Sequence, residues 1–347
     1  MAPVLRLLLL IVVPVGLYVL LLSRSSKEQE AYHQCSLTPK NPEDRRLNKT
    51  TLRLVHWNVE WLFTQGGRGS VRCPGHMCTW PDRQAGLGHL DRVTDVLKKI
   101  DGDIVSLVEV EDCAVLGPIV DRLKSGYQPY LTKSRDTALG QHLALLTRID
   151  PHRLLFDDSS VFYPIEGSKC LGKYKGSTSL SKHFVAHFQI GNRPITLIAV
   201  HLIARPRDRS RCGKREAQAM IVDNLIKEHS RIDGSLIVMG DFNDHDGDLN
   251  GTEPLSPLVF DLIKRKHNLT NVASLLPPID RYTNWWDRNK NCRVDRNELT
   301  MIDHVLVSAD LSDLIVNVKI GHDLFKASCD TYKRTSDHWP IIVDLKF

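Results

Sequence analysis

The sequence has no internal repeat and no low-complexity tract, and its glycine and proline contents are ordinary, at 21 and 17 of 347 residues. These features exclude a fibrous chain and a disordered chain. No charge of one sign dominates, because the formal net charge is only +5. This mild excess permits binding to a polyanion without requiring it. The length and the 42% of hydrophobic residues suit one large α/β domain or two smaller ones.

Charged residues are absent from the apolar stretch 7–23, which lies between Arg6 and Arg24. The stretch is long for a signal peptide and slightly short for a membrane span. We therefore expect residues 1–23 to be a signal peptide or an uncleaved signal anchor. A buried cytosolic helix fits less well, because the stretch is terminal and apolar on all faces. Residues 24–50 are polar and predict a linker, and residues 51–347 then form one domain.

A second CxxC-type pair is also missing, which argues against zinc at Cys73, His76 and Cys78. The chain has eight cysteines, and an even number suits disulfides in an oxidising compartment, although the sequence leaves their pairing open. Cys73 and Cys78 could close a local loop. Glycosylation sequons begin at Asn48, Asn250 and Asn268. We expect a secreted protein, or a type II membrane protein with a lumenal or extracellular domain that contacts the membrane only through its N-terminal segment. Nothing indicates a protein partner.

Strand and helix patterns alternate along the remaining sequence. Period-2 or continuous apolar runs predict strands over 52–59, 103–110, 144–147, 301–308 and 339–345. A hairpin over 183–201 turns at Gly191-Asn192, and SLIVMGDFNDHD (235–246) opens with a buried strand. Amphipathic spacing predicts helices over 91–100 and 214–228. The pattern indicates one α/β domain with mixed strand connections.

Carboxylate, amide and imidazole groups recur where these strands enter or leave the core. Six separate segments supply them: Asn58 and Glu60, Glu109, His201, Asp241 and Asn243, and the pairs Asp303-His304 and Asp337-His338. One such group would be a turn or cap residue. Clustered acids repel one another and lose solvation unless a cation lies among them. Oxygen ligands favour Mg²⁺, Mn²⁺ or Ca²⁺ over zinc. By contrast, we expect Glu111, Asp244, Asp246 and Asp248 to be solvated loop acids.

The segments HWNVEWL, SLVEVE, AVHL, GDFND, MIDHVLVS and SDHWPIIVDL resemble, in order, those of the metal-dependent endonuclease/exonuclease/phosphatase superfamily. This superfamily includes deoxyribonuclease I, abasic-site endonucleases of the exonuclease III type, neutral sphingomyelinases and inositol polyphosphate 5-phosphatases. The resemblance covers about residues 52 to 347. It implies an α/β fold, a four-layer sandwich of two packed mixed β-sheets flanked by helices, with the site at one edge.

The resemblance also implies a metal site and its ligands. Glu109 resembles the principal metal carboxylate of the family. Asn58 and Glu60 match the residues that complete the metal shell, and Asp337 resembles a second acid near the metal. The implied cofactor is Mg²⁺, with Mn²⁺ as an alternative.

Catalytic roles carry over in the same way. Asp241 resembles the aspartate that orients or deprotonates the attacking water, and Asn243 resembles its partner at the phosphate. His338 resembles the histidine beside the scissile phosphate, with Asp303 as the carboxylate that holds it. His201 occupies the place where deoxyribonuclease I-like members carry a histidine.

Two stretches bear on the substrate. The segment after His201 is rich in cations, and Arg205, Arg207, Arg209 and Arg211 in it could track a nucleic-acid backbone or form a solvated loop. Trp285 and Trp286 could contact DNA by stacking or pack in the core. The range 287–298 also resembles a calcium loop, although Cys292 stands where glycine is usual, so a structural Ca²⁺ there is a further possibility.

These observations favour a metal-dependent phosphodiesterase, an exported nuclease acting on DNA or RNA. The main alternative is a lipid phosphodiesterase of the sphingomyelinase type, which an N-terminal anchor would suit. A phosphomonoesterase and a catalytically inactive binding module fit less well, because the acids and histidines are intact.

Overall fold

The computed structural model describes residues 35, 38–64, 80–132, 134–136, 138–170, 174–230, 234–250 and 253–347. The N-terminal apolar stretch and the cysteines at 73 and 78, with the predictions made for them, lie outside these residues. No helix within the described ranges is long and apolar enough to cross a membrane.

Two six-stranded mixed sheets form the centre of the fold. The first runs β15 (Ile315–Ile320), β16 (Ile341–Lys346), β1 (Thr51–Leu62), β2 (Ile104–Val110), β4 (His142–Thr147), β3 (Gln128–Thr132). The second runs β11 (Thr270–Asn271), β14 (Asp303–Val307), β10 (Ser235–Asp241), β9 (Arg193–His201), β8 (His183–Ile190), β5 (Arg153–Leu155). Both sheets contain parallel and antiparallel pairs, as predicted.

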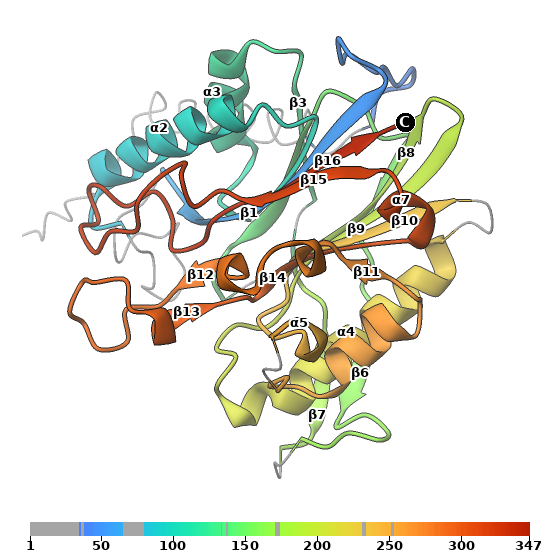
Figure 1. Cartoon of the computed structure of the whole chain (residues 1–347), viewed down its shortest axis with the longest axis vertical. Coiled ribbons are helices and arrows are strands. Elements are labelled where there is room, and N and C mark those ends of the chain that lie inside the picture. The colour runs from blue at the N-terminus through green and yellow to red at the C-terminus, as the bar shows by residue number, and fades with distance from the viewer. Residues whose placement is uncertain are drawn as a thin grey trace, which may run out of the picture.

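Helices cover the outer faces of the two sheets (Figure 1). The long helices are α2 (Arg83–Ile100), α3 (Cys113–Leu123) and α4 (Cys212–His229). Short elements are α5 (Gly247–Asn250), α6 (Leu258–Phe260), α7 (Ala309–Ser312), η2 (Arg209–Arg211), η3 (Asp261–Arg265), η4 (Val272–Leu275), η5 (Pro278–Asp280) and η6 (Arg296–Glu298). Two small hairpins join β6 (Ser160–Tyr163) to β7 (Gly176–Ser179) and β12 (Asn284–Trp285) to β13 (Leu299–Thr300).

Three buried clusters define the four layers. One lies between the sheets, with Leu54 of β1 and Ile237 of β10 among its members. A second packs β1, β2 and β4 against α2 and α3, and a third packs β8, β9 and β10 against α4. Figure 1 shows α2 and α3 on one side of the sheets and α4 on the other. The predicted four-layer sandwich is confirmed.

The packed domain begins earlier than predicted. Arg45 forms an ion pair with Asp150, and the guanidinium of Arg46 lies 2.7 Å from the Asp44 carboxylate. Asp44 also forms an isolated β-bridge with Ile149. Residues from Glu43 onward therefore belong to the domain rather than to a free linker.

Two disulfides are present in the described part of the chain, Cys170–Cys212 and Cys292–Cys329. Cys35 and Cys113 lie together in the buried cluster under α2 and α3. The prediction that cysteines pair is confirmed for these two bonds.

Candidate active site

The strand alternation itself places polar groups between the sheets. On β1, Leu52 and Leu54 belong to the core between the sheets, and His56 and Asn58 continue the same period-2 face. On β10, Ile237 and Met239 precede Asp241 in the same way, and on β9 the apolar positions end at His201. Each strand thus changes from apolar to polar at the same edge of the sandwich.

Strand pairing then brings the polar ends of neighbouring strands together. Asp241 of β10 lies opposite Asp303 of β14 in the antiparallel register and opposite His201 of β9 in the parallel register. Gly240 permits this close approach, because a Cβ at this position would lie 2.0 Å from the Val200 carbonyl oxygen. The cluster therefore depends on sheet register rather than on flexible loops.

Irregular backbone turns two further acids toward the cluster. Glu60 and Glu109 have φ values of 49° and 70°, in the left-handed region that non-glycine residues rarely adopt. The register between β1 and β2 shifts at the same place, as a β-bulge does when it redirects a side chain. Asn58 Nδ2 lies 3.3 Å from Glu109 Oε1 and 3.1 Å from Asp241 Oδ2. Asn58 thereby links the two sheets through their acids.

His338 and Asp303 form a buried charged pair. His338 Nδ1 lies 2.6 Å from Asp303 Oδ2, and both residues are almost completely buried. Burial opposes charge on the ring, yet the carboxylates of Asp303 and Asp337 raise the pKa of His338 well above its usual value. Burial alone would raise the pKa of Asp303, but His338 holds it well below the usual range. The pair is thus an imidazolium and a carboxylate.

Asp303 holds a second histidine that the sequence did not single out. His56 Nε2 lies 3.1 Å from Asp303 Oδ1, and the His56 ring is fully buried. Its Nδ1 has no hydrogen-bond partner among the described residues, so the hydrogen bond to Asp303 places the ring proton on Nε2. Both oxygens of Asp303 are therefore engaged by histidines, which fixes the plane of the carboxylate.

Asp241 is the acid best placed to exchange a proton. Its Oδ1 accepts a hydrogen bond from the Asn243 backbone N–H at 2.9 Å. Burial, with repulsion from Asp303, raises the pKa of Asp241 to about 7. Asn243 has a positive φ of 50°, and its side-chain amide donates to the Leu202 carbonyl at 3.2 Å. A carboxyl with a pKa near neutrality suits a general base.

His201 and Lys182 lie on the other side of Asp241. His201 Nε2 is 3.7 Å from Asp241 Oδ2 and 3.9 Å from Glu109 Oε1. Burial, reinforced by the charge of Lys182, lowers the pKa of His201 well below its usual value, so this ring is neutral. Lys182 is buried and donates to Gln141 Oε1 at 2.9 Å. Burial lowers the pKa of Lys182, and the attraction of its ammonium group to Asp136, Glu109 and Asp241 partly offsets this effect.

The carboxylates of Glu60, Glu109 and Asp337 repel one another, and the positive charge nearby is too small to neutralise them. Burial and repulsion from Asp337 raise the pKa of Glu60 to about 8, although Arg334 lies 2.7 Å from its Oε1. Burial also raises the pKa of Glu109. Glu60 Oε2 is buried and has no hydrogen-bond partner among the described residues. An orphaned buried carboxylate oxygen beside two further acids fits a divalent cation bound by hard oxygen ligands.

Ligand-type atoms of Asp241, Asp303 and His338 lie within 4.8 Å of one another. We favour Asn58, Glu60, Glu109 and Asp337 as the metal ligands, because His338 is protonated and its short hydrogen bond already satisfies Asp303. An imidazolium has no lone pair with which to bind a metal.

The predicted substrate-binding residues divide into two groups. Arg205 and Arg211 line a cavity beside His201, whereas Arg207 and Arg209 are exposed outside it. Trp286 is 67% exposed. Trp285 is buried and its Nε1 donates to Glu298 at 3.3 Å, which fits the alternative that this ring packs in the core.

The suggested calcium loop is closed by the protein itself. Asp287 accepts hydrogen bonds from the Asn291 and Cys292 backbone N–H groups. Glu298 accepts from the backbone N–H groups of Arg288 and Asn289. The disulfide of Cys292 ties the loop to Cys329. These bonds account for the loop conformation, and Ca²⁺ there stays a prediction.

Of the four acids that we expected to be solvated, Glu111, Asp244 and Asp246 are buried, whereas Asp248 is exposed as predicted. Asp244 and Asp246 are 0% and 3% exposed, and Glu111 is 7% exposed. Lys264 Nζ lies 2.6 Å from Asp246, and Arg215 lies 3.8 Å from Asp244. These ion pairs could not be predicted from the charges around Asp244 and Asp246, because Arg215 and Lys264 lie in other parts of the sequence.

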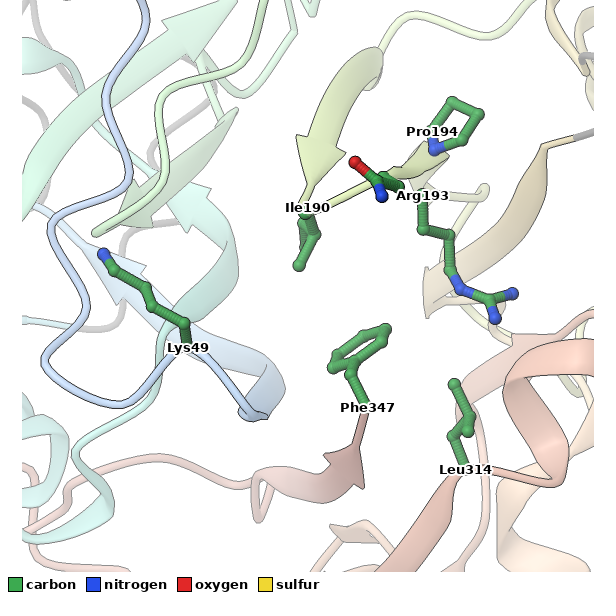
Figure 2. A pocket seen from close by; sticks show the side chains of 8 residues that line it. Lys49, Ile190, Arg193, Pro194, Leu314 and Phe347 are labelled. Carbon is green, nitrogen blue, oxygen red and sulfur yellow. The ribbon is translucent and has the colours of Figure 1, made fainter.

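A cavity of about 510 Å³ lies at the opposite edge of the sandwich. It is bounded by Arg193, at the start of β9, whereas His201 ends that strand. Figure 2 shows Ile190, Leu314 and Phe347 around the opening, with Lys49 and Arg193 on opposite sides. None of the residues that line this cavity belongs to the catalytic cluster. The nine residues of β9, at about 3.3 Å per residue, separate Arg193 from His201.

Sequence comparison assigns the family. The profile of the Endonuclease/Exonuclease/phosphatase family matches residues 55–338. The chain therefore belongs to the endonuclease/exonuclease/phosphatase family. No curated protein matches the chain significantly.

Solved structures share the fold at low sequence identity. A humanized TDP2 of D. rerio is 17% identical with a TM-score of 0.53, over 86% of this chain and 100% of that one. A 3′ phosphatase, NExo from Neisseria, bound to a product DNA hairpin, is 17% identical with a TM-score of 0.53, over 85% and 100%. An AP endonuclease from Archaeoglobus fulgidus is 14% identical with a TM-score of 0.54, over 84% and 98%.

Proposed function

We propose that the protein is a metal-dependent phosphodiesterase that hydrolyses DNA or RNA. One observation carries the proposal. The imidazolium of His338, the near-neutral carboxyl of Asp241 and the uncompensated acids Glu60 and Glu109 converge at one edge of the sandwich. Phosphodiester hydrolysis needs a base for water, positive charge for the phosphate oxygens and a site for a cation.

Each residue of the cluster has a role in this proposal. Asp241 accepts the proton of the attacking water, which its pKa of about 7 permits near neutral pH. His338 donates a hydrogen bond to a non-bridging phosphate oxygen and neutralises part of its charge. The side chain of Asn243 orients the phosphate, and neutral His201 assists the leaving oxygen.

Asn58, Glu60, Glu109 and Asp337 would hold the metal ion, for which Mg²⁺ is our first choice and Mn²⁺ the second. A bound divalent cation supplies Lewis-acid stabilisation of the charge that develops on the phosphate. Arg334 holds Glu60 by the hydrogen bond to its Oε1, and Trp61 donates its backbone N–H to Glu109 Oε2 at 3.1 Å. Both acids are thereby fixed before any cation binds.

The basic loop after β9 supports a nucleic-acid substrate over a choline-bearing lipid. Phosphate backbones gain affinity from each cation they contact, and Trp286 offers an exposed ring for base stacking. The similar structures of D. rerio TDP2 and of the Neisseria phosphatase were solved with a single-strand DNA product and a DNA hairpin, respectively.

The test is hydrolysis by purified protein with Mg²⁺ or with chelator, against plasmid DNA, single-stranded RNA and sphingomyelin vesicles. Asp241→Ala removes the proposed base, and Asp313→Asn, an exposed acid before β15, is the matched control. We expect metal-dependent cleavage of DNA or RNA that Asp241→Ala abolishes and Asp313→Asn retains. Headgroup release from vesicles without nucleic-acid cleavage would instead establish the lipid phosphodiesterase.

We further propose that the domain is exported, either secreted or anchored as a type II membrane protein. The two disulfides favour an oxidising compartment, and the sequon residues Asn48 and Asn268 are exposed. Expression in mammalian cells, followed by glycosidase treatment of the medium and of the membrane fraction, tests this. A glycosidase-sensitive protein in either fraction supports export, and a glycan-free cytosolic protein refutes it.

A further inference from the structure

A second cavity, of about 560 Å³, adjoins the catalytic cluster at His201. Its walls come from the β3–β4 loop, from β7 and the residues after it, and from the loop that leads into α4 with the first turns of that helix. Pockets of about 300–1,000 Å³ enclose most of a small ligand. The cavity is therefore large enough for a nucleotide-sized group next to the scissile bond.

The cavity carries a clear excess of positive charge. Lys182, Arg205, Arg211 and Lys214 line it, and Asp136 is the one acid among the described lining residues. Four cations against one carboxylate leave an excess of three positive charges. An anion that enters the cavity relieves the repulsion among these cations.

Ion pairs among the described residues do not neutralise most of this charge. Within the described ranges, neither Arg205 nor Lys214 has an ion-pair partner. Arg211 lies 3.4 Å from Asp208, and both side chains are partly exposed. Lys182 is 3.8 Å from Asp136 and is also attracted to Glu109 and Asp241, so its charge is partly offset within the protein.

The loop that presents these cations is held rigidly. Arg215, fully buried, donates to the carbonyl oxygens of Ile203 and Arg205 and to Ser256 Oγ. Arg205 has a φ of 63°, a conformation that a non-glycine residue keeps only when its surroundings impose it.

Further bonds fix the same wall. Arg211 donates to the Ala204 carbonyl at 3.1 Å, and the Cys170–Cys212 disulfide joins the start of α4 to the β6–β7 connection. A preformed cationic wall binds an anion without the cost of ordering the loop.

We propose that this cavity binds a terminal phosphomonoester of the substrate strand, so that hydrolysis at Asp241 takes place near a phosphorylated strand end. The inference rests on the proposed nuclease function. A phosphomonoester carries a charge of about −1.5 to −2 at neutral pH, whereas an internal phosphodiester carries one negative charge. The three excess positive charges match the monoester better.

The kinetic test uses one oligonucleotide sequence in four forms: with a 5′-phosphate, with a 3′-phosphate, with hydroxyls at both ends, and circularised. The wild type is compared with Arg205→Ser and Lys214→Ser, and with Lys99→Ser, an exposed cation on α2, as the control. We expect kcat/KM to be at least about tenfold higher for one phosphorylated form, which corresponds to about 1.4 kcal/mol. Arg205→Ser and Lys214→Ser should lower kcat/KM for that phosphorylated form at least about tenfold more than for the hydroxyl form.

Equal rates on all four forms, or an equal loss on every form in the two variants, would overturn the inference and leave the nuclease function standing. Calorimetric titration of the metal-free protein with inorganic phosphate gives a second readout that does not need catalysis. Phosphate binding that Arg205→Ser and Lys214→Ser weaken about tenfold, and Lys99→Ser does not, supports the cavity even if no nucleic acid is hydrolysed. Binding that the two cavity variants leave intact refutes it.

Discussion

Glu60→Gln tests whether the carboxylate group is a metal site, because it removes one of the charges that the metal-free fold must bury. Burial and Asp337 raise the pKa of Glu60 from 4.5 to about 8. The folded protein therefore holds the proton more tightly than the unfolded chain. The stability from this group is fully present below about pH 4.5 and is lost as the pH rises through about 8.

The size of the effect follows from the same values. Each unit between the two pKa values corresponds to about 1.4 kcal/mol of stability. Ionisation of Glu60 can therefore lower the free energy of unfolding by at most about 5 kcal/mol. Only relaxation of the site can reduce it, since Glu60 is 6% exposed. For a domain of this length, 1 kcal/mol corresponds to roughly 2 °C in Tm, which predicts a Tm difference of up to about 10 °C.

Thermal denaturation in chelator provides the assay. At about pH 5 Glu60 is protonated and Glu60→Gln should melt close to the wild type, whereas at about pH 8 the variant should melt higher. Saturating Mg²⁺ at about pH 8 should reverse the order, because only the wild type retains the full ligand set. Glu166→Gln, an exposed matched substitution, should follow the wild type throughout. Parallel curves for Glu60→Gln and the wild type from pH 5 to 8 would refute the reasoning.

Three further predictions concern the neighbours of the cluster. His56→Phe should lower kcat at least about tenfold with little change in KM, whereas His56→Gln, whose amide can still donate to Asp303, should recover most of kcat; equal losses in the two variants would mean that His56 only fills space. Lys182→Met should lower kcat/KM about tenfold while unfolding at the same or a higher temperature, because an incompletely paired buried charge is replaced by an apolar chain of similar length; a large loss of Tm would contradict this. Gly240→Ala should lower the free energy of unfolding by about 3 kcal/mol or more, since its Cβ meets the Val200 carbonyl, and an unchanged denaturant midpoint would show that β9 and β10 can separate.

Strand positions were predictable because the apolar runs are continuous. The hairpin of β8 and β9 turns at Gly191 as expected, and the predicted strand over 103–110 matches β2 within one residue. Helix α3 was missed because Pro118 lies inside it, and proline usually interrupts a helix. Its start has a sequence signal, since Asp112 caps the N–H groups of Ala114 and Val115.

Part of the site could also be predicted from the alternation of side chains between the two faces of a strand. Asn58 and Asp241 each lie two residues beyond a position on the face between the sheets, His56 and Met239 respectively, and counting by twos reaches them. Glu60 and Glu109 escape this rule, because their positive φ values break the alternation. They were identified in the sequence by their place at strand ends and by the resemblance to family motifs.

Lys182 and Arg334 were missed for a different reason. Neither lies in an acidic or aromatic motif, and each acts on groups far away in the sequence. Lys182 interacts electrostatically with Glu109 and Asp241, and Arg334 reaches Glu60 from the segment before β16. Cross-sheet charge balance depends on which strand ends are neighbours, and strand order is not encoded in any local pattern.

The same balance explains why the acids of this protein differ in protonation over a short distance. Asp303 is engaged by His56 and His338 and stays ionised. Asp241, its cross-strand neighbour, accepts only amide N–H groups and titrates near neutral pH. Two aspartates in register on adjacent strands thus serve as a permanent anion and as a proton acceptor. If His56 sets this difference, its removal should disturb catalysis through Asp303 without any contact between His56 and the substrate.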